Sequence, residues 1–475
     1  MRNHMFINGK WAGAAAAFAV RDPATWEPIT EVPDGRSEDM HRALEAASTA
    51  FWGWRALSAK ERGAILAETA RILHARRQAL AELITLEQGK PLAEARTEAD
   101  TAAEFFDWYA GETLRVYGAV IPSWTRQKRL VTTSQPLGVV LAITPWNFPA
   151  AMIARKVAPA LAAGCTVVAK PAEQTPLSAL FLADCLQDAG LPDGALNVVT
   201  TADPAAVVSA ALANPVVRKV SFTGSNDVGR VVFQQAARHY VGMSLELGGS
   251  APFLIFADAD LDSAVAGAIQ SKFRNAGQTC VCTNRIYVQR PVWEQFVERF
   301  SSQVRKLRVG RGQDPTTDIG PVIDGQGYAK ILNHVQDAVQ QGASLVCGVI
   351  PFTQDTGPFF VEPVVLANVG DELRVASRET FGPVAPILTF DQEEEAVERA
   401  NRTPYGLAAY VYTQNLARAT RVCEQLEYGV VGLNDAVPAT PQAPFGGVKA
   451  SGLGREGGRE GIEEFLFTKF ISVGV

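Results

Sequence analysis

The feature that most constrains the fold is a change of pattern at Gly138. From there, short apolar runs alternate with stretches of roughly 10–20 residues that have helical periodicity. Five of these runs are strand candidates: Val139–Ile143, Thr166–Ala169, Leu196–Val199, Val217–Phe222 and Met243–Leu245. Such alternation is typical of βαβ units, with a mostly parallel sheet and helices on both of its faces. The sequence therefore predicts an α/β fold.

A second alternating series follows Cys280 and predicts a second α/β domain. Its strand candidates are Ile286–Val288, Ser344–Cys347, Phe360–Leu366, Ala385–Phe390, Ala408–Val411 and Val430–Leu433. Two domains suit a chain of 475 residues, which is longer than one hydrophobic core usually supports. The segment 116–136 and the tail Phe465–Val475 are expected to be isolated strands. Because such strands need a partner, we expect a homo-oligomer, either a dimer or a tetramer.

Helices are expected before the first sheet. Ser37 is the expected cap of one of them. Ser58 and Glu61 have the spacing of a capping box for the next helix, whose periodic apolar residues continue until Gly89 and Pro91. These signals place a helical layer ahead of the alternating region.

Composition excludes several classes of protein. The formal net charge of -6 argues against a nucleic acid or an anionic membrane as partner. The six cysteines are scattered, unlike those of a secreted disulfide framework, and the five histidines lack metal-ligand spacing, so we expect no metal. The apolar run Val157–Ala169 is too short to span a bilayer. We expect a cytoplasmic enzyme.

The run from Asn275 to Cys282 is the first candidate for chemistry. Cys280 ends a stretch of small and polar residues between a helix-like and a strand-like segment. Such a turn can lift a thiolate nucleophile out of the core. A free cysteine, however, more often packs as a small hydrophobe, so the run alone leaves both interpretations open.

Polar residues also follow the predicted parallel strands, at the end where ligands bind such sheets. Asn147 can stabilise an oxyanion or cap the next helix, and Lys170 and Glu173 can hold a ribose or form a solvated turn. The turn at Gly224 and Ser225 suits a pyrophosphate, although it is not the G-x-G-x-x-G fingerprint. Finally, Glu246 can act as a general base or be an ordinary turn carboxylate.

Seven short motifs together resemble the aldehyde dehydrogenase superfamily, in order and in approximate spacing. They are TPWNFP (144–149), KPAEQTP (170–176), SFTGS (221–225), ELGG (246–249), GQTC (277–280), ETFGP (379–383) and PFGGVK (444–449). The resemblance covers essentially the whole chain. It implies an NAD-binding Rossmann-like domain (1–115 and 137–247), an α/β catalytic domain (248–446) and a small β oligomerisation element (116–136 and 455–475).

The resemblance also implies a role for each candidate residue. Cys280 attacks the aldehyde, the Asn147 amide and the Cys280 N–H hold the oxyanion of the thiohemiacetal, and hydride transfer to the nicotinamide leaves a thioester. Glu246 then activates the water that hydrolyses this thioester. The residues implied in cofactor binding are Trp146, Lys170, Glu173, Gly224, Ser225, Leu247, Glu379 and Phe381.

Three further runs, MIARK (152–156), KFRNAGQTCVC (272–282) and GLGREG (452–457), make the chain most similar, within the superfamily, to succinate-semialdehyde dehydrogenases. In that group, arginines matching Arg155 and Arg274 bind the distal carboxylate of the substrate, although each can instead be part of a structural ion pair. A serine of the group is missing here, and Ala439 or Thr440 takes its place. Thr440 can supply the hydroxyl. Otherwise glutarate semialdehyde, 2-oxoglutarate semialdehyde or a neutral aldehyde becomes the expected substrate.

Two further expectations concern Glu173 and Cys282. A carboxylate at Glu173 would repel a 2′-phosphate, so NAD is expected in preference to NADP. Cys282 is expected either to form a reversible disulfide with Cys280 or simply to pack. A thiol esterase or acyl-transfer enzyme without redox chemistry, and a non-catalytic protein of the same fold, are the alternatives from other classes. The nucleotide-binding positions argue against the first, and the set of Cys280, Glu246 and Asn147 argues against the second.

Overall fold

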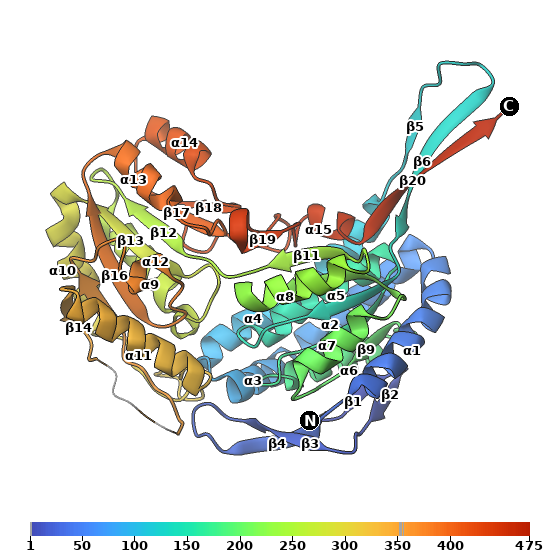
Figure 1. Cartoon of the computed structure of the whole chain (residues 1–475), viewed down its shortest axis with the longest axis horizontal. Helices are drawn as coiled ribbons and strands as arrows, with labels where there is room; N and C mark the ends of the chain where they lie inside the picture. Colours follow the sequence, from blue (N-terminus) through green and yellow to red (C-terminus); the bar gives the residue numbers. More distant parts are fainter. Residues whose placement is uncertain (1, 351–353, 355) are drawn as a thin grey trace.

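The computed structural model describes residues 2–350, 354 and 356–475 of the chain. Two α/β bodies lie side by side, and a narrow three-stranded sheet projects from the first of them (Figure 1). In the described part of the chain, no helix is both long and apolar enough to cross a bilayer.

The first body is built on an eight-stranded sheet with a parallel centre. Its order is β19-β11-β10-β7-β8-β9-β1-β2. The five central strands are β11 (Gly242–Glu246), β10 (Val217–Thr223), β7 (Val139–Ile143), β8 (Thr166–Lys170) and β9 (Leu196–Val198). Antiparallel edge strands are added by β1 (Met5–Ile7), β2 (Lys10–Ala12) and β19 (Gly452–Leu453). The five predicted strands of the first series are thus confirmed.

Helices cover both faces of this sheet, as the alternation predicted. Strand β7 shows why: Val140 and Ala142 join one hydrophobic core, whereas Leu141 and Ile143 join the other. The first core holds α2 (Ala59–Ala75), α3 (Arg77–Gln88), α4 (Leu92–Glu112), α5 (Pro149–Ala163) and α6 (Leu177–Asp188). The second core holds α1 (Ser37–Ala56), α7 (Pro204–Leu212) and α8 (Asn226–Ala237).

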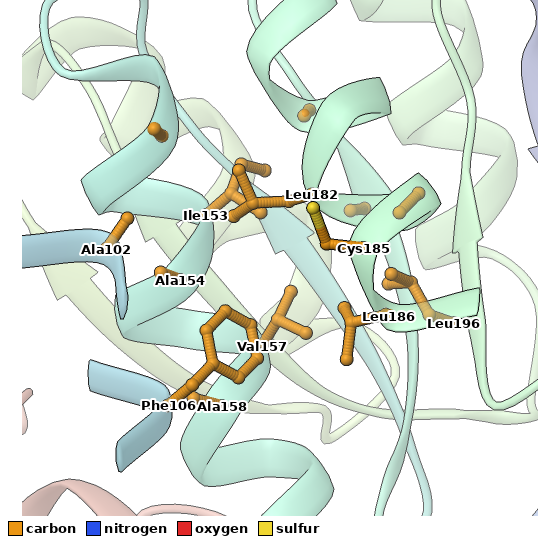
Figure 2. Close-up of a cluster of buried hydrophobic side chains, with 14 of the residues drawn as sticks. Ala102, Phe106, Ile153, Ala154, Val157, Ala158, Leu182, Cys185, Leu186 and Leu196 are labelled. Atoms are coloured by element: carbon orange, nitrogen blue, oxygen red, sulfur yellow. The ribbon is translucent and has the colours of Figure 1, made fainter. Parts of the chain in front are cut away.

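Helix α5 is buried along its entire length. Figure 2 shows Val157 and Ala158 of α5 beside Phe106 of α4, with Leu182 and Leu186 of α6 on the other side. Apart from Arg155 and Lys156, the residues of α5 are apolar, as expected of a helix that is enclosed on all sides. It is therefore a rigid support for the polar residues that it carries.

The second body has a seven-stranded sheet of order β14-β15-β16-β13-β12-β17-β18. All its pairings are parallel except that of β14. The strands are β12 (Ala251–Ile255), β13 (Thr283–Gln289), β14 (Ser344–Cys347), β15 (Val364–Ala367), β16 (Val384–Phe390), β17 (Ala408–Tyr412) and β18 (Val430–Leu433). The helices of this body are α9 (Leu261–Phe273), α10 (Trp293–Val304), α11 (Gly325–Gln340), α12 (Arg374–Ser377), α13 (Glu393–Asn401) and α14 (Leu416–Gln425).

The two segments predicted to be isolated strands pair with each other. The projecting sheet consists of β5 (Ala119–Ile121), β6 (Lys128–Pro136) and β20 (Leu466–Gly474). Strand β20 pairs antiparallel with β6 along nine residues and forms an edge of the sheet. The short α15 (Glu460–Glu463) precedes β20, and the hairpin of β3 (Ala17–Arg21) and β4 (Pro28–Pro33) lies near the N-terminus.

Three local predictions were wrong. Arg36 and not Ser37 is the N-cap of α1, because the Asp39 carboxylate accepts from the Arg36 N–H. The helix predicted from Ser58 to Gly89 breaks at Arg76, whose guanidinium binds carboxylates of α6. The strand predicted over Phe360–Leu366 begins only at Val364, since Pro363 has no N–H to donate to a ladder.

Candidate active site

Cys280 follows a turn of unusual backbone conformation. Asn275, Ala276 and Gly277 have φ values of 53°, 56° and 73°, which lie in the left-handed region. A Cβ at Gly277 would lie 2.2 Å from the carbonyl oxygen of Gly382, so only glycine fits there. The Asn275 N–H donates to the Glu94 carboxylate at 2.8 Å. Local strain of this kind persists only where the surroundings hold it, and is concentrated at functional sites.

Side-chain amides hold this turn against the first body. The Asn275 amide donates to the carbonyl oxygens of Asn147 (3.0 Å) and Gln278 (3.1 Å). The Gln278 amide donates to the carbonyl oxygens of Asn275 and Pro321, and accepts from the Ile323 N–H. The loop before α5 and the turn before Cys280 are therefore fixed relative to each other.

Asn147 is buried and does not cap α5. Its Nδ2 donates to the Gln278 carbonyl oxygen at 3.0 Å, and its Oδ1 has no hydrogen-bond partner among the described residues. The first free N–H groups of α5, those of Ala150 and Ala151, donate to the Glu98 carboxylate at 2.9 and 3.3 Å. With the cap supplied from α4, the Asn147 amide remains directed toward the segment that carries Cys280.

Cys280 is partly buried, and burial is the main influence on the pKa of its thiol. Burial raises its pKa to about 12, and the carboxylates of Glu379 and Glu246 act in the same direction. The guanidinium groups of Arg155 and Arg274 oppose this shift. Both arginines thus lie close enough to Cys280 for their charge to act on the sulfur, although they come from different bodies.

Glu246 ends β11 and is buried. Neither of its carboxylate oxygens has a hydrogen-bond partner in the described part of the chain. Burial, and then the neighbouring Glu456, raise the pKa of Glu246 well above its ordinary value, while Lys156 and Arg155 oppose the shift. A Cβ at Gly446 would lie 2.8 Å from Glu246 Oε1, so the PFGG loop packs directly against this carboxylate. An unpartnered buried carboxylate with a raised pKa is a good candidate base.

A second buried carboxylate lies behind Glu246, and sequence reasoning assigned it no role. Glu456 forms an ion pair with Lys156 of α5 and accepts from the Ser221 hydroxyl at 3.3 Å. The only signal for it was its place in the Gly-rich run after PFGGVK. Lys90 was missed as well. Its ammonium group donates to the Asn147 carbonyl oxygen at 2.8 Å and to Glu98 at 2.6 Å.

A cleft of about 420 Å³ opens between the two bodies beside Cys280. Seven of the other predicted site residues line it together with Cys280: Trp146, Asn147, Gly224, Ser225, Leu247, Glu379 and Phe381. Trp146 and Phe381 contact edge to face, with centroids 5.6 Å apart. The Glu379 carboxylate accepts from the Gly249 N–H at 3.1 Å. Glu246 does not line the cleft.

Lys170 and Glu173 lie at the end of β8, outside the lining of this cleft. The Lys170 ammonium is buried, which lowers its pKa, and it lies 3.6 Å from the Glu173 carboxylate. The Glu173 side chain is 39% exposed, so it remains accessible to a ligand. Gln174, the next residue, does line the cleft.

Cys282 and Thr440, the predicted redox and substrate residues, differ in burial. Cys282 is buried, its pKa is raised by burial, and its thiol donates to the carbonyl oxygens of Lys272 and Thr283 at 3.4 Å. Thr440 is exposed in the loop before Phe445. The structure gives no contact that joins Thr440 to either arginine.

Comparisons with known proteins agree with this arrangement. The model of the aldehyde dehydrogenase family matches residues 11–471. A succinate-semialdehyde dehydrogenase (NADP(+)) of Escherichia coli (strain K12) and a glutarate-semialdehyde dehydrogenase of Pseudomonas putida are each 49% identical, over 100% of this chain and 98% of their own length. The crystal structure of an E. coli NADP-dependent enzyme, 49% identical, matches with a TM-score of 0.97 over 100% of this chain and 98% of the other. The chain belongs to the aldehyde dehydrogenase family.

Proposed function

We propose that this enzyme oxidises an aldehyde that carries a distal carboxylate, with succinate semialdehyde as the first candidate and glutarate semialdehyde as the second. The observation that carries this proposal is the pair of guanidinium groups, Arg155 and Arg274, which both lie close enough to Cys280 to favour its thiolate form. Arg155 has a long ion pair, 3.8 Å from the Glu456 carboxylate, and no carboxylate of the described residues lies within 4 Å of the Arg274 guanidinium, so both arginines can bind a substrate anion. Relatives named for both semialdehydes support the same substrate class.

The proposed chemistry begins at Cys280, whose thiolate adds to the aldehyde carbon. The Asn147 amide and the Cys280 N–H would stabilise the oxyanion of the thiohemiacetal. After oxidation of this adduct to a thioester, Glu246 would take a proton from the water that releases the acid. The raised pKa of Glu246 supports this role because it makes the carboxylate a stronger base.

A nicotinamide dinucleotide, when bound, supplies the acceptor for the hydride. The cleft beside Cys280 fits such a group: Thr223 Oγ1 is a buried hydroxyl without a partner among the described residues, and it lies on the cleft wall with Gly224 and Ser225. We propose that Ser225 and the start of α8 hold the pyrophosphate, that Glu379 holds a ribose hydroxyl, and that Phe381 and Trp146 pack beside the ring. Leu247 would complete the wall.

We further infer that NAD is preferred over NADP. The half-exposed Glu173 carboxylate would accept from ribose hydroxyls and repel a 2′-phosphate, although Lys170 at 3.6 Å offsets part of its charge. In steady-state kinetics we expect a higher kcat/KM with NAD, and Glu173→Gln should raise kcat/KM for NADP by about tenfold. Equal efficiency of the wild-type enzyme with both cofactors would count against this preference.

The test of the substrate class compares succinate semialdehyde, glutarate semialdehyde and butanal. Arg155→Ala and Arg274→Ala should each lower kcat/KM for the semialdehydes by about 10- to 100-fold, since each removes a charge-assisted contact. Butanal oxidation should change little. Arg421→Ala, a surface arginine on α14 that pairs with Glu393, is the matched control. Equal losses for butanal would remove the role of the two arginines.

The domain boundaries, the assembly and the roles of Thr440 and Cys282 are also proposals. We propose the division into an NAD-binding domain (1–115 and 137–247), a catalytic domain (248–446) and an oligomerisation element (116–136 and 455–475), with a cytoplasmic homo-oligomer as the working form. A contact of Thr440 with the substrate carboxylate and a Cys280–Cys282 disulfide also stay predictions. Peroxide inactivation that dithiothreitol reverses, and that Cys282→Ala abolishes, would support the disulfide.

A further inference from the structure

Arg155 is a buried cation with few of the hydrogen bonds and close ion pairs that usually offset the cost of burying a charge. It is 9% exposed, and its Nε has no hydrogen-bond partner in the part of the chain that the structure describes. Among the described carboxylates, only Glu456 lies within 4 Å of its guanidinium, at 3.8 Å. The other oxygen of Glu456 is engaged with Lys156 and Ser221. A buried guanidinium normally requires closer partners than this.

Two aromatic rings surround this guanidinium instead. Its central carbon lies 4.4 Å from the ring centroid of Phe445 and 5.2 Å from that of Phe105. Both rings are themselves buried, at 5% and 2% exposure. A ring face attracts a cation without using its N–H groups, and the attraction is strongest where water is excluded.

Arg285 shows how the same chain holds an arginine whose two terminal nitrogens are both hydrogen-bonded, although its Nε, like that of Arg155, has no partner among the described residues. It is also buried, and its guanidinium donates to the carbonyl oxygens of Ser250 and Ala400 and to the Tyr428 hydroxyl. Such a guanidinium has few donors left for a ligand. Arg155 differs, because aromatic rings stabilise its charge and no hydrogen bond to a described residue occupies its N–H groups.

We propose that Phe105 and Phe445 form an aromatic clamp that positions Arg155 and keeps its N–H groups free for the distal anion of the substrate. The clamp makes these two phenylalanines determinants of specificity for anionic aldehydes. A carboxylate in their place would neutralise Arg155 and occupy its donors. This inference rests on the proposed function, because it assumes that Arg155 binds the substrate anion.

The first test uses two neighbouring phenylalanines of α4. Phe106 is as buried as Phe105, but it packs beside Val157 and Ala158 and has no contact with Arg155 among those the structure gives (Figure 2). Phe105→Leu should raise KM for succinate semialdehyde by about fivefold to twentyfold, with kcat and the KM for butanal unchanged. Phe106→Leu should leave both KM values unchanged while lowering thermal stability to a similar extent.

The second test uses Phe445, so that the outcome does not depend on Phe105→Leu folding. Phe445→Leu removes the ring and should raise KM for succinate semialdehyde selectively, whereas Phe445→Tyr keeps the ring and should restore the wild-type value. Equal effects of Phe445→Leu on butanal and succinate semialdehyde would overturn the clamp, because they would indicate lost packing alone.

Arg155→Ala distinguishes a failure of the aromatic clamp from a failure of the proposed function. If this variant loses the preference for succinate semialdehyde while Phe105→Leu and Phe445→Leu keep it, the clamp is wrong and the proposed function stands. If Arg155→Ala keeps the preference, the assignment of Arg155 to the substrate anion fails, and the clamp fails with it.

Discussion

At the scale of one residue, burying the Glu246 carboxylate in the candidate site lowers the stability of the folded chain. Water would solvate both oxygens of this carboxylate in the unfolded chain, whereas in the folded chain neither has a partner among the described residues. Burial and the neighbouring Glu456 therefore raise its pKa. The folded chain holds this proton more tightly than the unfolded chain, so the group's contribution to stability falls as the pH rises above 4.5, the ordinary glutamate value.

Replacing this carboxylate should separate stability from activity. Glu246→Gln should be more stable than wild type by about 1–3 kcal/mol at high pH, because no charge is then buried. The difference should shrink as the pH falls, because the wild-type carboxylate then takes up a proton and loses its charge. Thermal unfolding of both proteins between pH 5 and 9 measures this, and kcat should fall by at least about 100-fold. A variant that is less stable than wild type at every pH would contradict the argument.

At the scale of elements, the start of α5 depends on α4. Glu98 accepts from two N–H groups of α5 and pairs with Lys90, which in turn holds the Asn147 carbonyl oxygen. Burial lowers the pKa of Lys90, so the ammonium form depends on its carboxylate partner. The Lys90–Glu98 ion pair thus connects α4 with the start of α5, the helix that carries Arg155, and with the backbone of Asn147, the candidate oxyanion donor.

Removing Lys90 and removing Glu98 should have non-additive effects on stability, because each side chain is the partner of the other. Lys90→Met or Glu98→Gln alone leaves a buried group without its partner and should destabilise by about 3–5 kcal/mol. The double variant should lose clearly less than the sum of the two, which a double-mutant cycle by thermal or denaturant unfolding measures. Additive losses would show that the two side chains do not act together.

Elements specified by neighbouring residues were predictable from the sequence, and those specified by distant ones were not. The capping box of Ser58 and Glu61 is local and is confirmed. The break at Arg76 depends on carboxylates more than 100 residues away, and the cap of α5 comes from Glu98, so no local pattern indicates either. The same holds within the site: the motifs indicated the residues that line the cleft, but not the buried groups behind them.

At the scale of the whole molecule, the projecting sheet presents a long uncovered strand edge. Strand β20 is an edge strand of nine residues, and several of its large apolar side chains are exposed. They are Phe467, Phe470, Ile471 and Val473. A long, apolar edge is normally blunted by charge or covered by another chain.

The exposed edge therefore predicts self-association through β20. The wild-type chain should run as a dimer or a larger assembly in size-exclusion chromatography with light scattering. The double variant Phe470→Lys/Val473→Lys should reduce the mass of that assembly, because desolvating two ammonium groups opposes burial of the strand. Ser472→Lys, which adds one charge on the same strand without removing an apolar side chain, should have a smaller effect. A wild-type monomer, or an unchanged mass in the double variant, would mean that β20 does not mediate assembly and that its apolar residues remain exposed to solvent.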